Sequence, residues 1–102
     1  MNWKPRHEIV YAIVDQAGVP RYVGRTAQPL TTRLWAHRSA KTPVGSWLRC
    51  DAGQGAQIIG LEQMPDVPLS TPYAGDRERH WIESYRAEVH ELLNVWPMRE
   101  AA

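Results

Sequence analysis

The sequence contains little that would cross-link the chain or place it in a membrane. It has one cysteine, Cys50, which excludes an internal disulfide and a zinc site built from several cysteines. No apolar run approaches the ~20 residues that span a bilayer. The first residues are not followed by the long apolar stretch of a signal peptide. These absences predict a soluble protein of a reducing compartment, which we expect to be cytoplasmic and without a membrane partner.

The chain is short and nearly neutral. Its 102 residues suit one small domain, whose core we expect over about residues 8–96. The net charge of +1 hides an asymmetry between the two halves. Residues 1–49 carry eight basic and two acidic side chains, whereas residues 50–102 carry four basic and nine acidic ones. Balances of +6 and −5 favour an anionic partner for the first half.

Hydrophobic patterning predicts three strands and two or three helices. Residues 8–14 are apolar and β-branched, typical of a strand buried on both faces, and a turn at 15–18 leads into a second strand at 19–25. A helix then follows Pro29 over residues 30–37, and a short helix follows at 44–50. A third strand is predicted at 56–64, a proline-marked loop at 65–72 and a long helix at 74–89. Residues 92–96 return to the core. The order β-β-α-(α)-β-α predicts an α+β domain with a small three-stranded, largely antiparallel sheet flanked by helices.

Two tyrosines fall on the predicted hairpin. If residues 15–18 form the turn, Val14 faces Val19, and Tyr11 lies directly opposite Tyr22 on the same side of the sheet. A loop with an odd number of residues would separate them, because a one-residue slip turns a side chain to the other face. The pair either stabilises the hairpin alone or belongs to a site.

Three polar side chains lie at or within predicted apolar helix faces. Arg33 and His37, four residues apart, fall on one edge of the stripe formed by Leu30 and Leu34. Arg33 there either grips a phosphate or lays its stem along the core. Glu78 falls within the stripe of the long helix, so it is expected to pair with an arginine or to hold a metal, because an unpaired buried charge is costly.

These residues together resemble the GIY-YIG nuclease family. The name-giving motifs correspond to Ile9-Val10-Tyr11, where Ile9 replaces the opening glycine, and to Tyr22-Val23-Gly24. The segment from Tyr22 through Arg33 to His37 is similar to the family's second strand and first helix. The segments around Glu78 and Asn94 look like those that carry the family's metal-binding glutamate and late asparagine. The resemblance covers about residues 8–96.

The resemblance implies a stand-alone, divalent-metal-dependent DNA endonuclease or nickase that uses one metal ion. Glu78 would hold Mg²⁺ or Mn²⁺, and Arg33 would offset charge in the transition state. Tyr11 would act as the base for the attacking water or position it, and since a phenol is a weak base, Tyr22 or His37 would assist. Asn94 would anchor the C-terminal segment or orient a phosphate, and Gly24 would have a structural role.

The partner implied is DNA, with a rim of phosphate contacts from residues close to the site in sequence, namely Arg21, Arg25, Arg38 and Lys41. Trp35 and Trp47 are either DNA-contacting or core side chains. A homodimer or a separate specificity partner stays open. Two other functions remain as alternatives: a nucleic-acid-binding module of the same fold that has lost cleavage, and a small interaction protein unrelated to nucleic acid.

Overall fold

The computed structural model describes residues 8–63, 72–88 and 91–94 of the chain. The elements are β1 (Ile9–Val14), β2 (Pro20–Thr26), α1 (Leu30–Ser39), α2 (Pro43–Arg49), a 3₁₀ turn (Asp51–Gly53), β3 (Gln57–Gln63) and α3 (Pro72–Ala87). The predicted α+β class, element order and three-stranded antiparallel sheet are confirmed. No described helix is long and apolar enough to cross a membrane.

The element bounds differ from the predictions at prolines. α2 and α3 begin at Pro43 and Pro72, earlier than predicted, because proline suits the first turn of a helix, where its missing N–H costs no hydrogen bond. Pro72 therefore opens the long helix and does not belong to the loop before it. The other two prolines of that predicted loop, Pro65 and Pro68, lie outside the described residues, as does the end of the predicted return segment at 95–96.

The sheet has the order β2-β1-β3, with both pairs antiparallel. The predicted hairpin register is wrong by two positions: Tyr11 lies opposite Gly24, and Tyr22 lies opposite Ile13. One position arises because Val14 pairs with Pro20 and not with Val19, and the second arises between Ile13 and Val14, where one extra residue of β2 is accommodated as a bulge. A shift of two positions leaves every side chain on its predicted face, so Tyr11 and Tyr22 are still neighbours, with ring centroids 6.3 Å apart.

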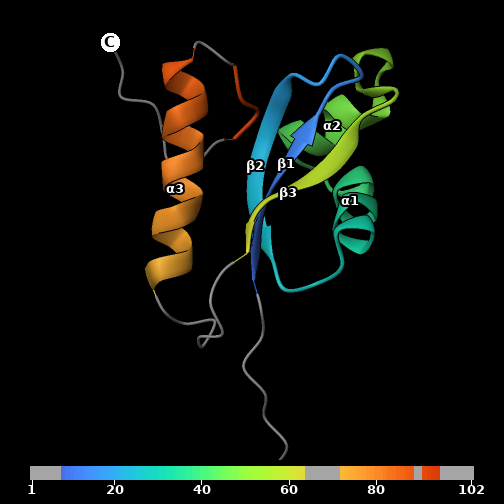
Figure 1. The fold of residues 1–102 in the computed structure, drawn as a ribbon. Helices are drawn as coiled ribbons and strands as arrows, with labels where there is room; N and C mark the ends of the chain where they lie inside the picture. The colour runs from blue at the N-terminus through green and yellow to red at the C-terminus, as the bar shows by residue number, and fades with distance from the viewer. Residues whose placement is uncertain (1–7, 64–71, 89–90, 95–102) are drawn as a thin grey trace, which may run out of the picture.

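β1 is the middle strand and is covered on both faces (Figure 1). One face packs against α3 through the fully buried Val10 and Ile82. The other packs against α1 and α2, with Ile13 and Leu48 in its core. Burying each such aliphatic side chain stabilises the fold by about 1.5–3 kcal/mol. The first strand is therefore buried on both faces, as predicted.

β2 lies at an edge of the sheet, between the two layers of helices (Figure 1). Alternate residues of this strand point towards opposite layers. Tyr22 packs against the α1–α2 layer, whereas Val23 packs against the α3 layer. Side chains from both layers can therefore meet around this edge, and that is where the candidate site lies.

Candidate active site around the edge strand

A cavity of about 280 Å³ opens beside β2. Its walls come from β2, α1, α2, α3 and the segment at 91–94, so every layer of the fold contributes to it. Five of the six residues predicted to be catalytic line it, and the sixth, Tyr11, lies directly behind the wall that they form. The lining residues are Tyr22, Arg33, Ala36, His37, Ala40, Thr42, Pro43, Val44, Glu78, Leu93 and Asn94.

Tyr11 is fully buried, and its hydroxyl group contacts two of the cavity residues. The hydroxyl oxygen lies 2.6 Å from Nε2 of His37 and accepts a hydrogen bond from Nε of Arg33 at 3.3 Å. Arg33 can only donate, so His37 is the acceptor that the Tyr11 proton finds among the described residues. His37 must then carry its own proton on Nδ1. Tyr11 and His37 thus form an oriented donor–acceptor pair.

Burial sets the protonation states of this pair. It raises the pKa of Tyr11 to about 12, despite the opposing hydrogen bond from Arg33. Burial, followed by the charge of Arg33, lowers the pKa of His37 to about 4. At neutral pH Tyr11 is therefore a phenol and His37 a neutral imidazole. Tyr22 stacks edge-on against His37 with ring centroids 4.9 Å apart, and burial raises its pKa as well.

Gly24 makes room for the Tyr11 ring. A Cβ atom at this position would lie 2.5 Å from the Tyr11 hydroxyl oxygen, 2.6 Å from its Cζ and 3.0 Å from Cε2 of Tyr22. Real Cβ atoms do not approach other atoms so closely, so any side chain at position 24 would displace both rings. The sequence predicted a structural role for this glycine, and the structure supplies a specific one, because Gly24 lets the phenol lie flat against the edge strand.

Glu78 reaches the cavity from α3, on the other side of the edge strand. Its side chain is 15% exposed, and burial raises its pKa, with Arg25 opposing and Glu8 adding to that effect. Glu83, by contrast, is exposed on the same helix. Arg25 lies 3.7 Å from Oε1 of Glu78, so the predicted arginine pairing of this buried acid is present.

Asn94 ties the segment at 91–94 to the edge strand. Its Oδ1 accepts a hydrogen bond from the Val23 N–H at 2.9 Å, and its Nδ2 donates to the Val23 carbonyl at 2.6 Å. The side-chain amide thus pairs with β2 as the backbone of a further strand would. A second tie joins the Leu93 N–H to the Arg21 carbonyl. Of the two roles predicted for Asn94, these contacts favour the anchor.

The four arginines and lysines predicted to contact DNA have different surroundings. Arg21 pairs with Asp15 at 3.3 Å beside the hairpin turn, and Arg25 is engaged by carboxylates. Arg38 and Lys41 are exposed at the end of α1 and form no ion pair with a described residue. They lie within two residues of the cavity-lining Ala40 in sequence, and of the four they are the two without a described carboxylate partner.

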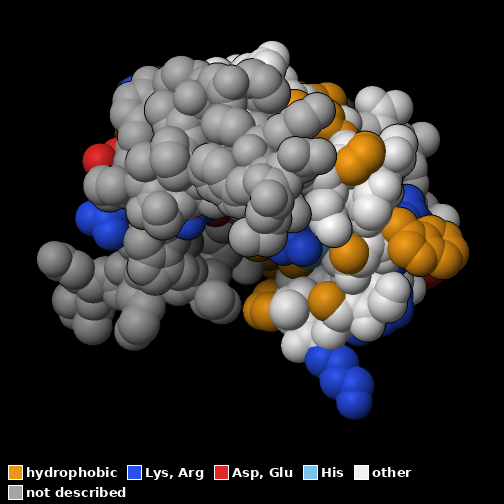
Figure 2. Space-filling view, turned by 90° about the horizontal axis from the view of Figure 1, so that it is seen from below, with side chains coloured by type: hydrophobic (Ala, Val, Ile, Leu, Met, Phe, Trp, Pro, Cys, Tyr) orange, Lys and Arg blue, Asp and Glu red, His pale blue; other side chains and the backbone are white. Residues whose placement is uncertain are grey.

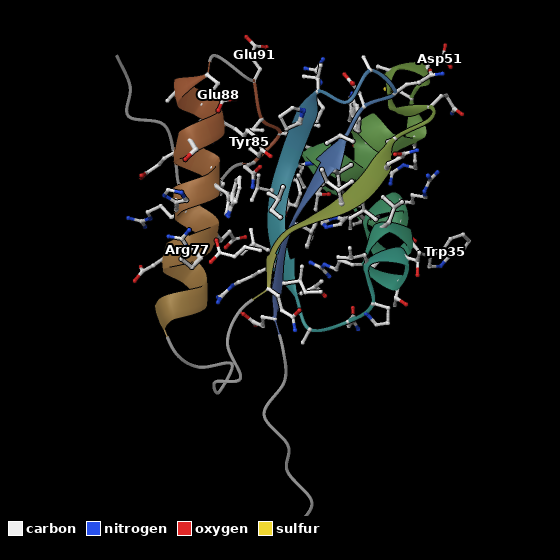
Figure 3. All side chains as sticks on the ribbon, in the orientation of Figure 1. Trp35, Asp51, Arg77, Tyr85, Glu88 and Glu91 are labelled. Atoms are coloured by element: carbon white, nitrogen blue, oxygen red, sulfur yellow. The ribbon has the colours of Figure 1, made fainter. Side chains whose placement is uncertain are left out.

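Two tryptophans that the sequence left undecided have different environments. Trp47 packs against the α1–α2 core. Trp35 is 73% exposed and projects from α1 away from the sheet (Figure 3). It does not line the cavity. The predicted catalytic set therefore converges without either tryptophan.

Sequence reasoning missed Glu8, which ion-pairs with Arg25 at 3.5 Å. A signal for it exists in the strand pattern. Glu8 precedes Val10 by two residues and so shares its face, and Val10 lies opposite Arg25 in the ladder. An acid at such a position, next to a buried strand, needs a cationic partner.

The residues present fit a magnesium site that uses few protein ligands. Among the residues that the structure describes, no group of three or more His, Cys, Asp and Glu side chains gathers in a way that could hold a metal. Magnesium nevertheless often binds through one or two carboxylates together with substrate phosphates and water. Glu78 supplies a carboxylate that faces the cavity and accepts no hydrogen bond from a described residue. Burial raises the pKa of this carboxyl, and a cation beside it would favour its charged form.

Comparisons with protein-family models, with curated proteins and with solved structures give no significant match to this chain. The resemblance to GIY-YIG nucleases therefore stays a prediction from the sequence motifs.

Proposed function

We propose that this protein is a divalent-metal-dependent endonuclease that hydrolyses phosphodiester bonds in DNA. The observation that carries the proposal is the convergence of the six predicted residues, which are spread from position 11 to position 94, on one cavity and its wall. The fold alone would license no activity. If each of the six residues had only a structural role of its own, nothing would require all six to lie around one cavity.

Arg33 is the group placed to bind the scissile phosphate. It lines the cavity, and its only hydrogen bond to a described residue is the 3.3 Å contact from Nε to Tyr11, which leaves the rest of its guanidinium for a ligand. The planar fork suits two phosphate oxygens at once. The charges of Arg38 and Lys41, exposed at the end of α1, would attract the DNA backbone.

The Tyr11–His37 pair is placed to move a proton away from an attacking water. Tyr11 cannot be a phenolate at neutral pH, because burial raises its pKa to about 12. It can accept a proton from water only while it passes its own to Nε2 of His37, 2.6 Å away. In this relay the oxygen of water attacks phosphorus as its proton leaves, and His37 carries the proton at the end.

Glu78 is the residue that would hold the metal ion. A bound Mg²⁺ or Mn²⁺ would polarise the phosphate and stabilise the leaving oxygen as its bond to phosphorus breaks. Asn94 and Gly24 act indirectly, the first by holding the wall segment against β2 and the second by leaving space for Tyr11.

The test is cleavage of supercoiled plasmid by the purified protein. We expect nicked or linear product with Mg²⁺ or Mn²⁺ and none with EDTA. Glu78→Gln and Tyr11→Phe should each reduce the rate at least about 100-fold, as loss of a metal ligand or a proton-transfer group does. Glu83→Gln, the same change at an exposed position of α3, is the matched control and should cut like wild type.

Two results would contradict the proposal. If Glu78→Gln cuts normally and Glu83→Gln does not, the metal assignment is wrong. If the wild type binds DNA but cuts no substrate under any metal condition, the alternative of a non-cleaving nucleic-acid-binding module is correct.

A further inference from the structure

Arg25 lies between two carboxylates and forms a hydrogen bond with neither. Its Nη1 lies 3.5 Å from Oε2 of Glu8, and its Nε lies 3.7 Å from Oε1 of Glu78. Neither contact is a hydrogen bond, and Oε2 of Glu8 is buried without any hydrogen-bond partner. A closed pair looks different in the same protein, since Arg77 holds Glu62 through three hydrogen bonds of 2.8–3.1 Å.

The strand pattern and α3 bring the three side chains together. Val10 and Arg25 face each other in the ladder, on the sheet face that packs against α3. Glu8 lies two residues before Val10 and so is on the same face. On α3, Gly75 precedes Glu78 by about one turn, and a Cβ at position 75 would lie 4.0 Å from Nη1 of Arg25. Gly75 therefore borders the guanidinium, at a distance where a Cβ atom would make only an ordinary contact.

The position of Arg25 between Glu8 and Glu78 has a direct electrostatic consequence. With both acids ionised, the three groups carry one net negative charge, which attracts a cation. Without Glu8, Arg25 and Glu78 would sum to zero, and nothing among the described residues would hold the guanidinium back from a closed pair with Glu78. In such a pair the guanidinium occupies about two of the roughly four lone-pair positions of the carboxylate and competes with a metal for the carboxylate charge.

We propose that Glu8 is a positioning residue of the metal site, which holds Arg25 away from Glu78 and so keeps the Glu78 carboxylate free to bind a divalent cation. This inference rests on the proposed function, because it takes Glu78 as the metal ligand. Glu8 itself need not touch the metal. A purely structural triad would affect the stability of the fold and leave the affinity for metal unchanged.

The experiment is a double-mutant cycle that measures Mn²⁺ affinity without DNA, by calorimetry or by the paramagnetic resonance signal of free Mn²⁺. Glu8→Gln should weaken binding about tenfold, the usual scale for loss of a group that orients a ligand. Arg25→Met should tighten binding, since it removes the competing cation. In the Arg25→Met background Glu8→Gln should have a smaller effect than in the wild type, because only the direct charge of Glu8 is then lost and no longer its hold on Arg25. Glu83→Gln is the matched control for loss of an acid near α3 and should bind Mn²⁺ like wild type.

Several outcomes would overturn the inference. Unchanged affinity in Glu8→Gln would make the triad structural, and an undiminished effect of Glu8→Gln in the Arg25→Met background would make Glu8 a ligand in its own right. If Glu8→Gln fails to fold, as judged by its near-ultraviolet circular dichroism, Arg25→Met decides alone: affinity no higher than wild type refutes the competition.

Failure of the inference is distinguishable from failure of the proposed function. If the wild type cleaves plasmid with Mn²⁺ and Glu78→Gln lowers Mn²⁺ affinity, the function stands whatever the cycle shows. If the wild type neither cuts nor binds Mn²⁺ in a Glu78-dependent way, the proposed function is wrong and the inference is overturned with it.

Discussion

The protonation state of His37 makes a quantitative prediction about stability. His37 is 5% exposed, and burial lowers its pKa from 6.5 to about 4. The unfolded chain therefore binds a proton at this residue between pH ~6.5 and ~4, while the folded protein does not. A group with a lowered folded pKa contributes stability above its unfolded pKa and loses it as the pH falls. The free energy of unfolding should thus decrease on acidification because of His37.

The size of the effect follows from the two pKa values. Linkage gives a loss of about 2 kcal/mol between pH 7 and pH 5, and about 3 kcal/mol by pH 4. His37→Gln removes the titrating group, so the difference in pH dependence between this variant and the wild type isolates the contribution of His37. Urea unfolding at pH 7, 6 and 5 can be followed by tryptophan fluorescence, since the chain has 5 tryptophans.

A matched control comes from the same residue type at an exposed position. His80 lies exposed on α3, so His80→Gln should leave the wild-type pH dependence intact. If His37→Gln and the wild type lose the same stability between pH 7 and pH 5, His37 is not the buried neutral acceptor of the Tyr11 proton. The proposed relay would then have no base, whatever the plasmid assay shows.

Two further predictions concern the residues that shape the cavity wall. Gly24→Ala should displace the Tyr11 phenol and lower cleavage at least about tenfold, since small misplacements of reacting groups are costly; Gly60→Ala, whose Cβ would make only ordinary contacts of 3.6 Å or more, should cut normally, and equal rates in both variants would contradict the role given to Gly24. Asn94→Ala should lower the free energy of unfolding in urea by about 1–3 kcal/mol, because it leaves both backbone groups of Val23 without their partner. A loss of cleavage with unchanged stability would instead show that Asn94 acts on the substrate.

The fold was predictable because its signals are local. The apolar run of β1, the turn around Asp15 and the helix start after Pro29 each act through nearby residues. The side-chain oxygen Oδ1 of Asp15 accepts hydrogen bonds from the N–H groups of Ala17 and Val19, which closes the turn. The register failed where a bulge intervened, since the length of a loop does not show whether a residue is paired or bulged.

The candidate site was predictable where it depends only on which face of a strand or helix a side chain occupies. Tyr11 and Tyr22 meet because the register shift is even, which keeps both rings on one face, and small, which keeps them within reach. The partner of Arg25 depends on which helix covers its face of the sheet, and no local pattern gives that. Arg25 was therefore predicted to contact DNA, whereas in the structure it lies between two acids.

The same contacts sharpen the meaning of the charge asymmetry. Of the described cations in the basic half, Arg21 and Arg25 pair with carboxylates, and Arg49 donates from Nη1 to the carbonyls of Arg38 and Ala40. The described cations of that half without a described carboxylate or carbonyl partner are Arg33, which lines the cavity, and Arg38 and Lys41, which are exposed at the end of α1. In Figure 2, apolar side chains on the described part of the surface are scattered among polar and basic ones. Binding of DNA to this protein should therefore depend on a few phosphate contacts around one opening, so that its salt dependence is shallow and its attraction local.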